Sequence, residues 1–448
     1  MKKFLPDLIA ILAFIILSFA YFFPADIEGR ILFQHDTAAG VGAGQESKEY
    51  LERTGERTRW TNSIFGGMPT YQMSPSYDST TSLKGVEKVY RLFLPDYVVL
   101  TFIMMLGFYI LLRAFGISAW LAGLGGVIWA FSSYFFILIP AGHIWKFVTL
   151  AYIPPTIAGV VLAYRKKYLL GGIVTALFIA LQIQSNHIQM SYYFMFVILF
   201  FVGAYFEDAY KKKELPHFFK ASGVLALAAV VGVCINISNL YHTYEYSKET
   251  MRGKSELKQE GAAASQTSSG LDRDYITNWS YGIGETLTLL VPNVKGGGSG
   301  STMSQSEAAM AKANPMYNGI YSQLPQYFGE QPWTAGPVYV GAFVMFLFVL
   351  GCFIVKGPLK WALLGATIFS ILLSWGKNFM GLTDFFIDYV PMYNKFRAVS
   401  SILVIAEFTI PLLAIFALKE ILSKPDMLKQ EKNCRGVIAA LVLTAGVA

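Results

Sequence analysis

Charged residues are scarce in this sequence. Asp, Glu, Lys and Arg make up 15% of its 448 residues, whereas hydrophobic residues make up 54%. A soluble domain carries about 25% charged residues, so this composition disfavours a soluble protein. Several apolar runs also exceed about 18 residues without an internal charge, which a large soluble protein with buried helices does not explain. The sequence therefore predicts an all-α polytopic membrane protein.

Cysteines are few, and the common enzyme motifs are missing. Cys234, Cys352 and Cys434 give no disulfide framework. The sequence has no GxxxxGK[ST] phosphate loop, no HExxH, no paired-cysteine metal site and no obvious arrangement of Ser, His and Asp around a nucleophile. The net charge of +7 comes from cations at the ends of apolar runs, which is a poor signal for nucleic acid. No soluble-enzyme class is therefore favoured, and no nucleic-acid partner is expected.

Ten apolar runs predict membrane-spanning helices. They cover residues 4–23, 98–112, 119–139, 144–163, 168–184, 188–206, 218–237, 338–355, 361–375 and 401–418. No small-residue cleavage site follows the first run, so we interpret it as a retained helix rather than a signal peptide. An eleventh run starts near Gly436 and stops at Ala448 before it could cross a bilayer. We therefore expect about eleven spans, in part of a longer protein.

These runs divide the chain into six segments. We expect the first helix in residues 1–23, an external loop in 24–97, further spans in 98–237, a second external loop in 238–337, more spans in 338–418, and a cytoplasmic loop with the start of another helix in 419–448. Lysines and arginines concentrate in alternate short loops, which all lie on one side of the membrane, whereas the opposite short turns are poor in them; this bias places the N-terminus in the cytoplasm. Both large loops then face the outside or the periplasm of a bacterial inner (cytoplasmic) membrane.

The first external loop is long for a connection between two spans, which indicates a function of its own. It contains His35 and Asp36, followed by a charged stretch at residues 45–59 that we expect to be helical. Residues 60–69 combine Trp, Phe and Pro with two glycines, which suits either an element packed on the membrane surface or an ordinary aromatic anchor. The second loop holds a flexible Gly- and Ser-rich run at residues 295–302, which suits either a lid or a tolerated insertion.

Polar side chains gather at the predicted external ends of many spans. The candidates are His143, Lys146, His187, Gln189, Tyr192, Lys395 and Arg397, and a fourth turn, after the seventh span, carries Asn236, Asn239 and His242. For any single residue, nearness to water is the simpler explanation, but four such turns together favour a site. The carboxylate of Asp36 suits a general base that acts on a hydroxyl, and the cations suit a phosphate leaving group. Together these features describe sugar transfer from a lipid phosphate.

The same segments resemble a known family. The chain is similar to the YfhO family of bacterial membrane proteins, which belongs to the GT-C superfamily of polytopic glycosyltransferases. The resemblance covers most of the chain but rests on short motifs: His35-Asp36-Thr37, Trp60 with Gly66-Gly67-Met68-Pro69, Gly142-His143 with Lys146, Gln184 to Tyr193, and Pro391 to Ala398.

The resemblance implies a GT-C-like helix bundle, a polyprenyl-phosphate-linked sugar as donor, and an envelope glycan or membrane lipid as acceptor. It also implies that Asp36 is the catalytic base and that Arg397, with Lys146 and His143, holds the donor phosphate. The residues expected to contact substrate are His35, His187, Gln189, Tyr192 and Lys395. Many superfamily members carry an acidic pair where this chain has His35 and Asp36, so dependence on a divalent metal stays open.

Two other classes of function compete with this interpretation. A transporter or flippase for a lipid-linked glycan is the first, but it predicts internal repeats, broken helices and charges at the bilayer midplane. No repeat is visible in the sequence, and the polar groups cluster at one end of the spans. A scaffold for an envelope complex explains the large loops but not the cluster of charges.

Overall fold

The computed structural model describes residues 4–253 and 270–447. The chain forms two compact units, each built from several stretches of sequence. Unit 1 comprises Met1–Ala130, Leu138–Ser191 and Leu215–Lys248, and unit 2 comprises Phe131–Ile137, Tyr192–Glu214 and Glu249–Ala448. The helices α7 (Ser133–Ala141) and α10 (Ile188–Lys212) contribute residues to both units.

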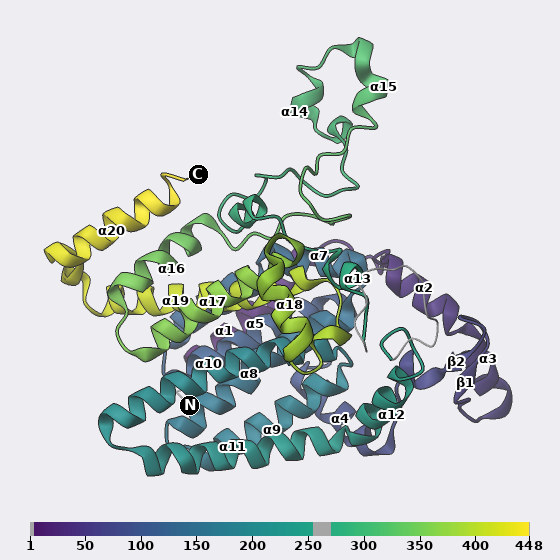
Figure 1. Cartoon of the computed structure of the whole chain (residues 1–448), viewed down its shortest axis with the longest axis horizontal. Coiled ribbons are helices and arrows are strands. Elements are labelled where there is room, and N and C mark those ends of the chain that lie inside the picture. Colours follow the sequence, from purple (N-terminus) through teal and green to yellow (C-terminus); the bar gives the residue numbers. More distant parts are fainter. Residues whose placement is uncertain (1–3, 254–269, 448) are drawn as a thin grey trace. The chain divides into compact units, whose positions relative to one another are not determined.

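Unit 1 consists of long apolar helices joined by shorter polar elements (Figure 1). Its apolar helices are α1 (Leu5–Phe22), α5 (Asp96–Ala114), α6 (Ala119–Ala130), α8 (Ile144–Tyr164), α9 (Tyr168–Gln184) and α11 (Leu215–Ile235). Its polar elements are α2 (His35–Ala43), α3 (Gln45–Thr54), β1 (Trp60–Thr61), β2 (Met68–Pro69), α4 (Thr81–Tyr90) and α12 (Ile237–Ser247), with 3₁₀ turns at Thr70–Gln72 and Asp78–Thr80.

The core of unit 1 is α8, which packs on α5 and α9 and is buried along most of its length. Glycines allow these helices to approach closely. A Cβ atom on Gly107 of α5 would lie 2.5 Å from the Ala151 carbonyl oxygen, and one on Gly171 of α9 would lie 2.7 Å from the Gly159 carbonyl oxygen. Small residues at such crossings are typical of helix packing in membranes, where close backbone contact replaces the hydrophobic effect.

The first predicted loop is largely folded. The charged stretch expected to be helical contains α3, whose last turn ends at Gly55 in the left-handed conformation. The aromatic stretch at residues 60–69 forms a two-stranded antiparallel hairpin, β1 with β2, which pairs Trp60 with Pro69. A Cβ atom on Gly67 would lie 2.7 Å from the Trp60 ring, so the indole packs flat over this glycine.

Unit 2 is also helical (Figure 1). Its helices are α13 (Arg273–Thr277), α14 (Glu307–Met310), α15 (Asn318–Tyr321), α16 (Ala342–Ile354), α17 (Pro358–Ser374), α18 (Met380–Tyr389), α19 (Val404–Ser423) and α20 (Glu431–Thr444). Its 3₁₀ segments are Gly284–Leu289, Met303–Gln305, Pro315–Tyr317, Gly376–Phe379, Tyr393–Lys395, Val399–Leu403 and Pro425–Lys429.

The buried helix α19 organises unit 2, since α16 and α17 both pack against it and α20 packs on α16. Figure 1 shows α14 and α15 at the tip of a segment that projects from these helices. A bridge between Thr302 and Pro325 closes the base of that segment. The Gly- and Ser-rich run leads into it and is bonded in place, with the Ser299 amide donating to the Thr334 carbonyl at 2.8 Å.

A sharp break follows α17. The next helical segment, Gly376–Tyr389, is bent from α17 by 110°. Gly376 has a φ of +46°, and a Cβ atom there would lie 2.6 Å from a Val399 methyl group. The Ser280 hydroxyl accepts the Lys377 amide at 2.8 Å, so contacts from distant segments stabilise the break. The predicted run at residues 361–375 therefore ends where the helix ends.

The helices support an integral membrane protein. Within the described residues, six helices are long and apolar enough to cross a bilayer. Two further pairs of helices, each bent at a short break, would raise the number of spans to eight if each pair crosses as one span. The six are Leu5–Phe22, Asp96–Ala114, Ile144–Tyr164, Ile188–Lys212, Leu215–Ile235 and Val399–Ser423. The predicted runs at 168–184 and 338–355 contain shorter apolar helices, Tyr168–Gln184 and Ala342–Ile354. The all-α membrane class is confirmed, whereas the count of eleven spans and the GT-C-like arrangement stay predictions.

Candidate functional site

Asp36 lies in the first turn of α2, and a short network fixes where that helix begins. Gln34, the residue before α2, has an extended backbone, and its buried side chain donates from Nε2 to the Ile139 carbonyl oxygen at 2.7 Å. Thr37 Oγ1 donates back to Gln34 Oε1 at 3.0 Å. The Leu32 amide donates to the Tyr97 hydroxyl at 3.0 Å. The chain entering α2 is thus tied to the end of α7 and to the start of α5.

The carboxylate of Asp36 lies between two histidines. His143 Nε2 is 3.0 Å from Asp36 Oδ2, and His35 Nδ1 is 3.4 Å from Oδ1. Asp36 remains 55% exposed and His143 48% exposed, so a ligand can still reach both side chains. His143 immediately precedes α8, the core helix of unit 1. The site is therefore supported by a rigid element and open to solvent.

Gly142 makes this approach sterically feasible. Its φ is +82°, a left-handed conformation that residues with a side chain rarely adopt. A Cβ atom there would lie 2.8 Å from the Thr37 amide nitrogen and 3.2 Å from Asp36 Cβ. The backbone before His143 therefore touches the first turn of α2, and only glycine fits between them.

Asp36 and His143 have complementary chemistry. A carboxylate is an acceptor only, whereas an imidazole N–H is a donor in both of its charge states when the proton is on Nε2. The pair can therefore orient the carboxylate while other lone pairs of its oxygens stay available to a hydroxyl. A negative charge in the first turn of a helix is also favoured by the helix dipole.

His187 adds a neutral imidazole to this end of unit 1. Burial is the main cause that lowers its pKa to about 3, and the nearby charges of Lys146 and His143 act in the same direction. Its Nδ1 is buried and has no hydrogen-bond partner among the residues that the structure describes. His187 is therefore uncharged at neutral pH and holds an unused polar atom near Lys146 and His143.

The other predicted site residues that are cationic or aromatic belong to unit 2. The Tyr192 hydroxyl donates to the Pro391 carbonyl oxygen at 2.9 Å. Lys395 Nζ donates to the Arg252 carbonyl oxygen at 2.7 Å, and Arg252 Nε donates to the Lys395 carbonyl oxygen at 3.0 Å. Partial burial lowers the pKa of both cations, and the charge of Arg397 contributes to the shift at Arg252.

Arg397 lies over two aromatic rings. Its guanidinium carbon is 5.4 Å from the centre of the Tyr275 ring and 5.8 Å from that of Trp279. One of its nitrogens also donates to the Tyr275 hydroxyl at 2.6 Å. Such rings stabilise a cation without neutralising it. Arg252, Lys395 and Arg397 thus form a cluster of positive charge in unit 2, called here the cation cluster.

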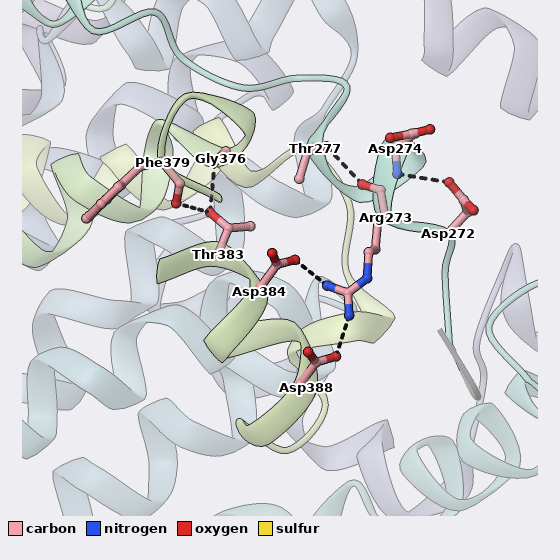
Figure 2. Close-up of polar contacts among 9 residues, drawn as sticks. All are labelled: Asp272, Arg273, Asp274, Thr277, Gly376, Phe379, Thr383, Asp384 and Asp388. Carbon is pink, nitrogen blue, oxygen red and sulfur yellow. Dashed lines mark hydrogen bonds and ion pairs between the residues drawn. The ribbon is translucent and has the colours of Figure 1, made fainter. Parts of the chain in front are cut away.

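Figure 2 shows how α13, which carries Tyr275, is held in unit 2. Arg273 of α13 pairs with Asp384 and, at 2.7 Å, with Asp388, two carboxylates one turn apart on α18. Asp272 caps α13 by accepting the Asp274 amide at 2.9 Å. An arginine shared between two carboxylates gives fixed geometry, so these pairs with α18 hold α13, and α13 in turn holds the Tyr275 ring against Arg397.

The structure brings together part of the predicted site. Asp36, His35, His143, Lys146 and His187 gather in unit 1, and Tyr192, Lys395 and Arg397 gather in unit 2. Gln189 is half-buried at the start of α10 in unit 1. That His143, Lys146, His187 and Arg397 line one cavity with Asp36 stays a prediction.

Sequence reasoning missed several residues of these clusters. Arg252 and Gln34 gave no local signal, because their partners lie far away in the sequence. Tyr275 and Trp279 are four residues apart, a spacing that places two side chains on the same side of a helix, and this signal could have been used.

Neither the arrangement of possible metal ligands nor similarity to known proteins assigns a function to these clusters. Among the residues that the structure describes, no group of three or more His, Cys, Asp or Glu side chains has a metal-binding arrangement. No family model, no curated protein and no solved structure matches this chain.

Proposed function

We propose that this protein is a membrane glycosyltransferase of the GT-C type, related to the YfhO family. Its donor is a polyprenyl-phosphate-linked sugar, and its acceptor is an envelope glycan or lipid at the external face of the bacterial inner membrane. The contact between Asp36 and His143 carries this proposal, because it joins a solvent-open carboxylate to an imidazole at the end of an apolar helix.

In the proposed reaction, Asp36 acts as the general base. The acceptor O–H bond breaks, its proton passes to the Asp36 carboxylate, and the oxygen forms a new bond to the anomeric carbon of the donor sugar. The bond between that carbon and the phosphate oxygen breaks, and its electron pair leaves with the lipid phosphate. His143 orients the carboxylate by donating to Oδ2.

The cation cluster is suited to the leaving phosphate. The side chains of Arg252 and Lys395 donate to backbone carbonyl oxygens, which do not neutralise a charge. Arg397 can offer two donors of its planar fork to phosphate oxygens, as arginine does at many phosphate sites. These three cations would stabilise the charge that develops on the phosphate as the sugar departs.

Transfer by the purified protein tests this proposal. The full chain, reconstituted in nanodiscs, is incubated with a radiolabelled polyprenyl-phosphate sugar and an extract of bacterial envelope glycans and lipids. We expect label to move from the donor to an acceptor and free polyprenyl phosphate to accumulate. Intact donor after prolonged incubation with every acceptor fraction would contradict the proposal.

A transporter of a lipid-linked glycan is the second candidate, and one buried carboxylate favours it. Glu407 lies inside α19 with no exposed surface, and its Oε2 accepts the Ser132 hydroxyl. Its Oε1 has no partner among the described residues. Ionisable groups inside membrane spans commonly serve transport. Proteoliposomes that move the labelled donor across the bilayer without cleaving it would favour this candidate over glycosyl transfer.

A further inference from the structure

The segment between α1 and α2 exposes an apolar surface that none of the proposed catalytic steps uses. Four large side chains form it: Phe23 is 65% exposed, Ile27 73%, Ile31 87% and Phe33 78%. These four residues are called here the apolar strip. Single exposed apolar residues are common on proteins, whereas several close together indicate a surface that contacts a partner or a membrane.

The first half of the strip lies on helical turns. The chain continues in such turns beyond α1, with the Glu28 amide donating to the Pro24 carbonyl oxygen at 2.9 Å. Phe23 and Ile27 are four residues apart, a spacing that places both side chains on one side of a helical turn. Gly29, in the left-handed conformation, ends these turns.

The second half of the strip alternates with inward-facing residues. Ile31 and Phe33 are exposed, whereas Leu32 is half-buried and Gln34 is buried. Alternation of this kind is typical of an extended chain that lies along a surface. Ile31 and Phe33 therefore share the outward face of this part of the chain.

Two contacts place the strip beside the ends of two apolar helices. The Leu32 amide donates to the Tyr97 hydroxyl at 3.0 Å, and the Tyr97 ring centre lies 6.2 Å from that of Phe22. Phe22 is the last residue of α1, and Tyr97 lies in the first turn of α5. Both helices are long and apolar enough to cross a bilayer. Ile31 and Phe33 thus lie at the level where two spans end.

The length of α1 sets the depth of this level. A helix of 18 residues is about 27 Å long, and the hydrocarbon core of a bilayer is about 30 Å thick. Most of α1 is not covered by protein, and Leu8, Leu12 and Ile16 are among its exposed residues. Because Phe23 follows α1 directly, the apolar strip continues the lipid-facing surface of α1 into the membrane interface.

The charges of this segment permit contact with lipid. Arg30 is the one cation between Phe23 and Phe33 in the sequence, and it pairs with Glu28. Both carboxylate oxygens of Asp26 are buried. The exposed charges therefore cancel, so the strip has no preference for anionic headgroups. Its apolar side chains favour the boundary between headgroups and acyl chains.

We propose that the apolar strip inserts into the lipid bilayer at this boundary and holds the start of α2 at the membrane surface. In the chain, Phe33 is followed by Gln34, His35 and Asp36. The insertion itself does not depend on any reaction. Its consequence for catalysis rests on the proposed function, because Asp36 would then act on a hydroxyl presented at the level of the headgroups.

Quenching by brominated lipids tests the insertion without donor or acceptor. In the full chain, Cys234, Cys352 and Cys434 are changed to serine, and Ile31→Cys or Phe33→Cys carries a nitrobenzoxadiazole label. The protein is placed in phosphatidylcholine nanodiscs with brominated or ordinary acyl chains. We expect blue-shifted emission at both positions and a loss of fluorescence in the brominated lipid. Added phosphatidylglycerol should not change either result.

Two control positions bracket the measurement. Ile16→Cys, on the exposed surface of α1, should be quenched by the brominated lipid. Glu56→Cys, exposed between α3 and β1, should be neither blue-shifted nor quenched. Because the label is itself apolar, a second measurement uses the unlabelled cysteines and a water-soluble thiol reagent. We expect Ile31→Cys and Phe33→Cys to lose reactivity with this reagent relative to Glu56→Cys.

Several outcomes would overturn the proposal. Quenching or thiol reactivity at Ile31→Cys and Phe33→Cys equal to that at Glu56→Cys would place the strip in water. Blue-shifted emission without quenching would show that a second copy or another protein covers the strip. Quenching only with phosphatidylglycerol would show that charge, not apolar contact, holds the segment. Absence of sugar transfer by a protein with quenched labels would instead contradict the proposed function and leave the insertion standing.

Discussion

At the residue scale, the two units hold their charged groups in different ways. Asp36 is held by histidines, which orient a carboxylate and leave it lone pairs for a hydroxyl. Arg252 and Lys395 are held by backbone carbonyl oxygens, which leave their charge available to an anion. The proposed function assigns the role of base to Asp36 and the binding of the phosphate to the cation cluster, and each assignment can be tested separately.

Arg397→Lys tests the anion site. Lysine keeps the charge but loses the planar fork that can hold two phosphate oxygens and stack on Tyr275 and Trp279. We expect KM for the polyprenyl-phosphate donor to rise about 10-fold or more, the cost of one lost charged hydrogen bond. Arg435→Lys on α20 is the control, because that arginine is exposed and paired with Glu431. Equal KM values for both variants would remove Arg397 from the donor site.

His187 should make stability depend on pH. Its pKa is about 3 in the folded protein and ordinarily 6.5, so the unfolded chain takes up a proton that the folded chain does not. The free energy of unfolding is therefore unaffected by His187 above pH 6.5. It decreases as the pH falls from 6.5 toward 3, by at most about 1.4 kcal/mol per pH unit. We therefore expect the melting temperature to fall further between pH 7.5 and pH 5 in the wild type than in His187→Gln.

His242→Gln is the matched control for this experiment, since His242 stacks on the Tyr77 ring at the surface. Between the two values of pH, its melting temperature should fall by as much as that of the wild type. If wild type and His187→Gln lose the same melting temperature on acidification, His187 is not buried as a neutral imidazole.

At the scale of elements, the site depends on the close contact between the first turn of α2 and Gly142, just before α8. Gly142→Ala adds a Cβ atom 2.8 Å from the Thr37 amide and forces an unfavourable φ, so the first turn of α2 must shift. Displacements of about 1 Å can cost roughly 100-fold in rate, so we expect transfer to fall at least about 10-fold. The thermal stability should change much less.

Gly85→Ala on α4 is the matched control. A Cβ atom on Gly85 meets nothing within 4 Å, and alanine favours a helix, so the variant should keep full transfer activity and gain slightly in stability. Similar losses of activity in Gly85→Ala and Gly142→Ala would show that close contact with α2 is not the cause.

The elements also show what the sequence could and could not predict. Apolar run length predicted α1, α5 and α8, and charge patterning predicted the helix at α3. The break after α17 was not predicted, because it depends on Ser280 and Val399, both distant in the sequence.

The candidate site was also predictable only in part, because its residue types could be predicted but the contact between them could not. The position of Asp36 after the first helix and of His143 at a turn predicted the residue types, but their contact depends on the bond from Gln34 to Ile139 and on the absence of a side chain at Gly142. Local patterns carry no information on such long-range contacts, so the pairing became visible only in the folded chain.

At the scale of the whole molecule, the distribution of lysine and arginine predicts topology. Lys211 and Lys212 end α10 and Lys213 follows it, and such clusters favour the cytoplasmic side. A reporter fused near Lys212 should read cytoplasmic, and one near Ser299 should read external or periplasmic. Enzyme reporters active only on one side of the membrane measure this. Reversed readings would place Asp36 in the cytoplasm and contradict transfer at the external face.

Sugar transfer by purified Asp36→Asn tests the role of this carboxylate most directly. Asparagine keeps the size of the side chain but cannot take up a proton at neutral pH, and loss of a general base costs about 10²–10⁴-fold in rate. Asp78→Asn, an exposed carboxylate in the same predicted external segment, is the control. We predict that Asp36→Asn binds the lipid-linked donor normally and transfers at most about 1% as fast as Asp78→Asn. Transfer by Asp36→Asn within a few-fold of the control would contradict the assignment of Asp36 as the base, and Asp26, Glu28 and Glu46 would be the next carboxylates to test.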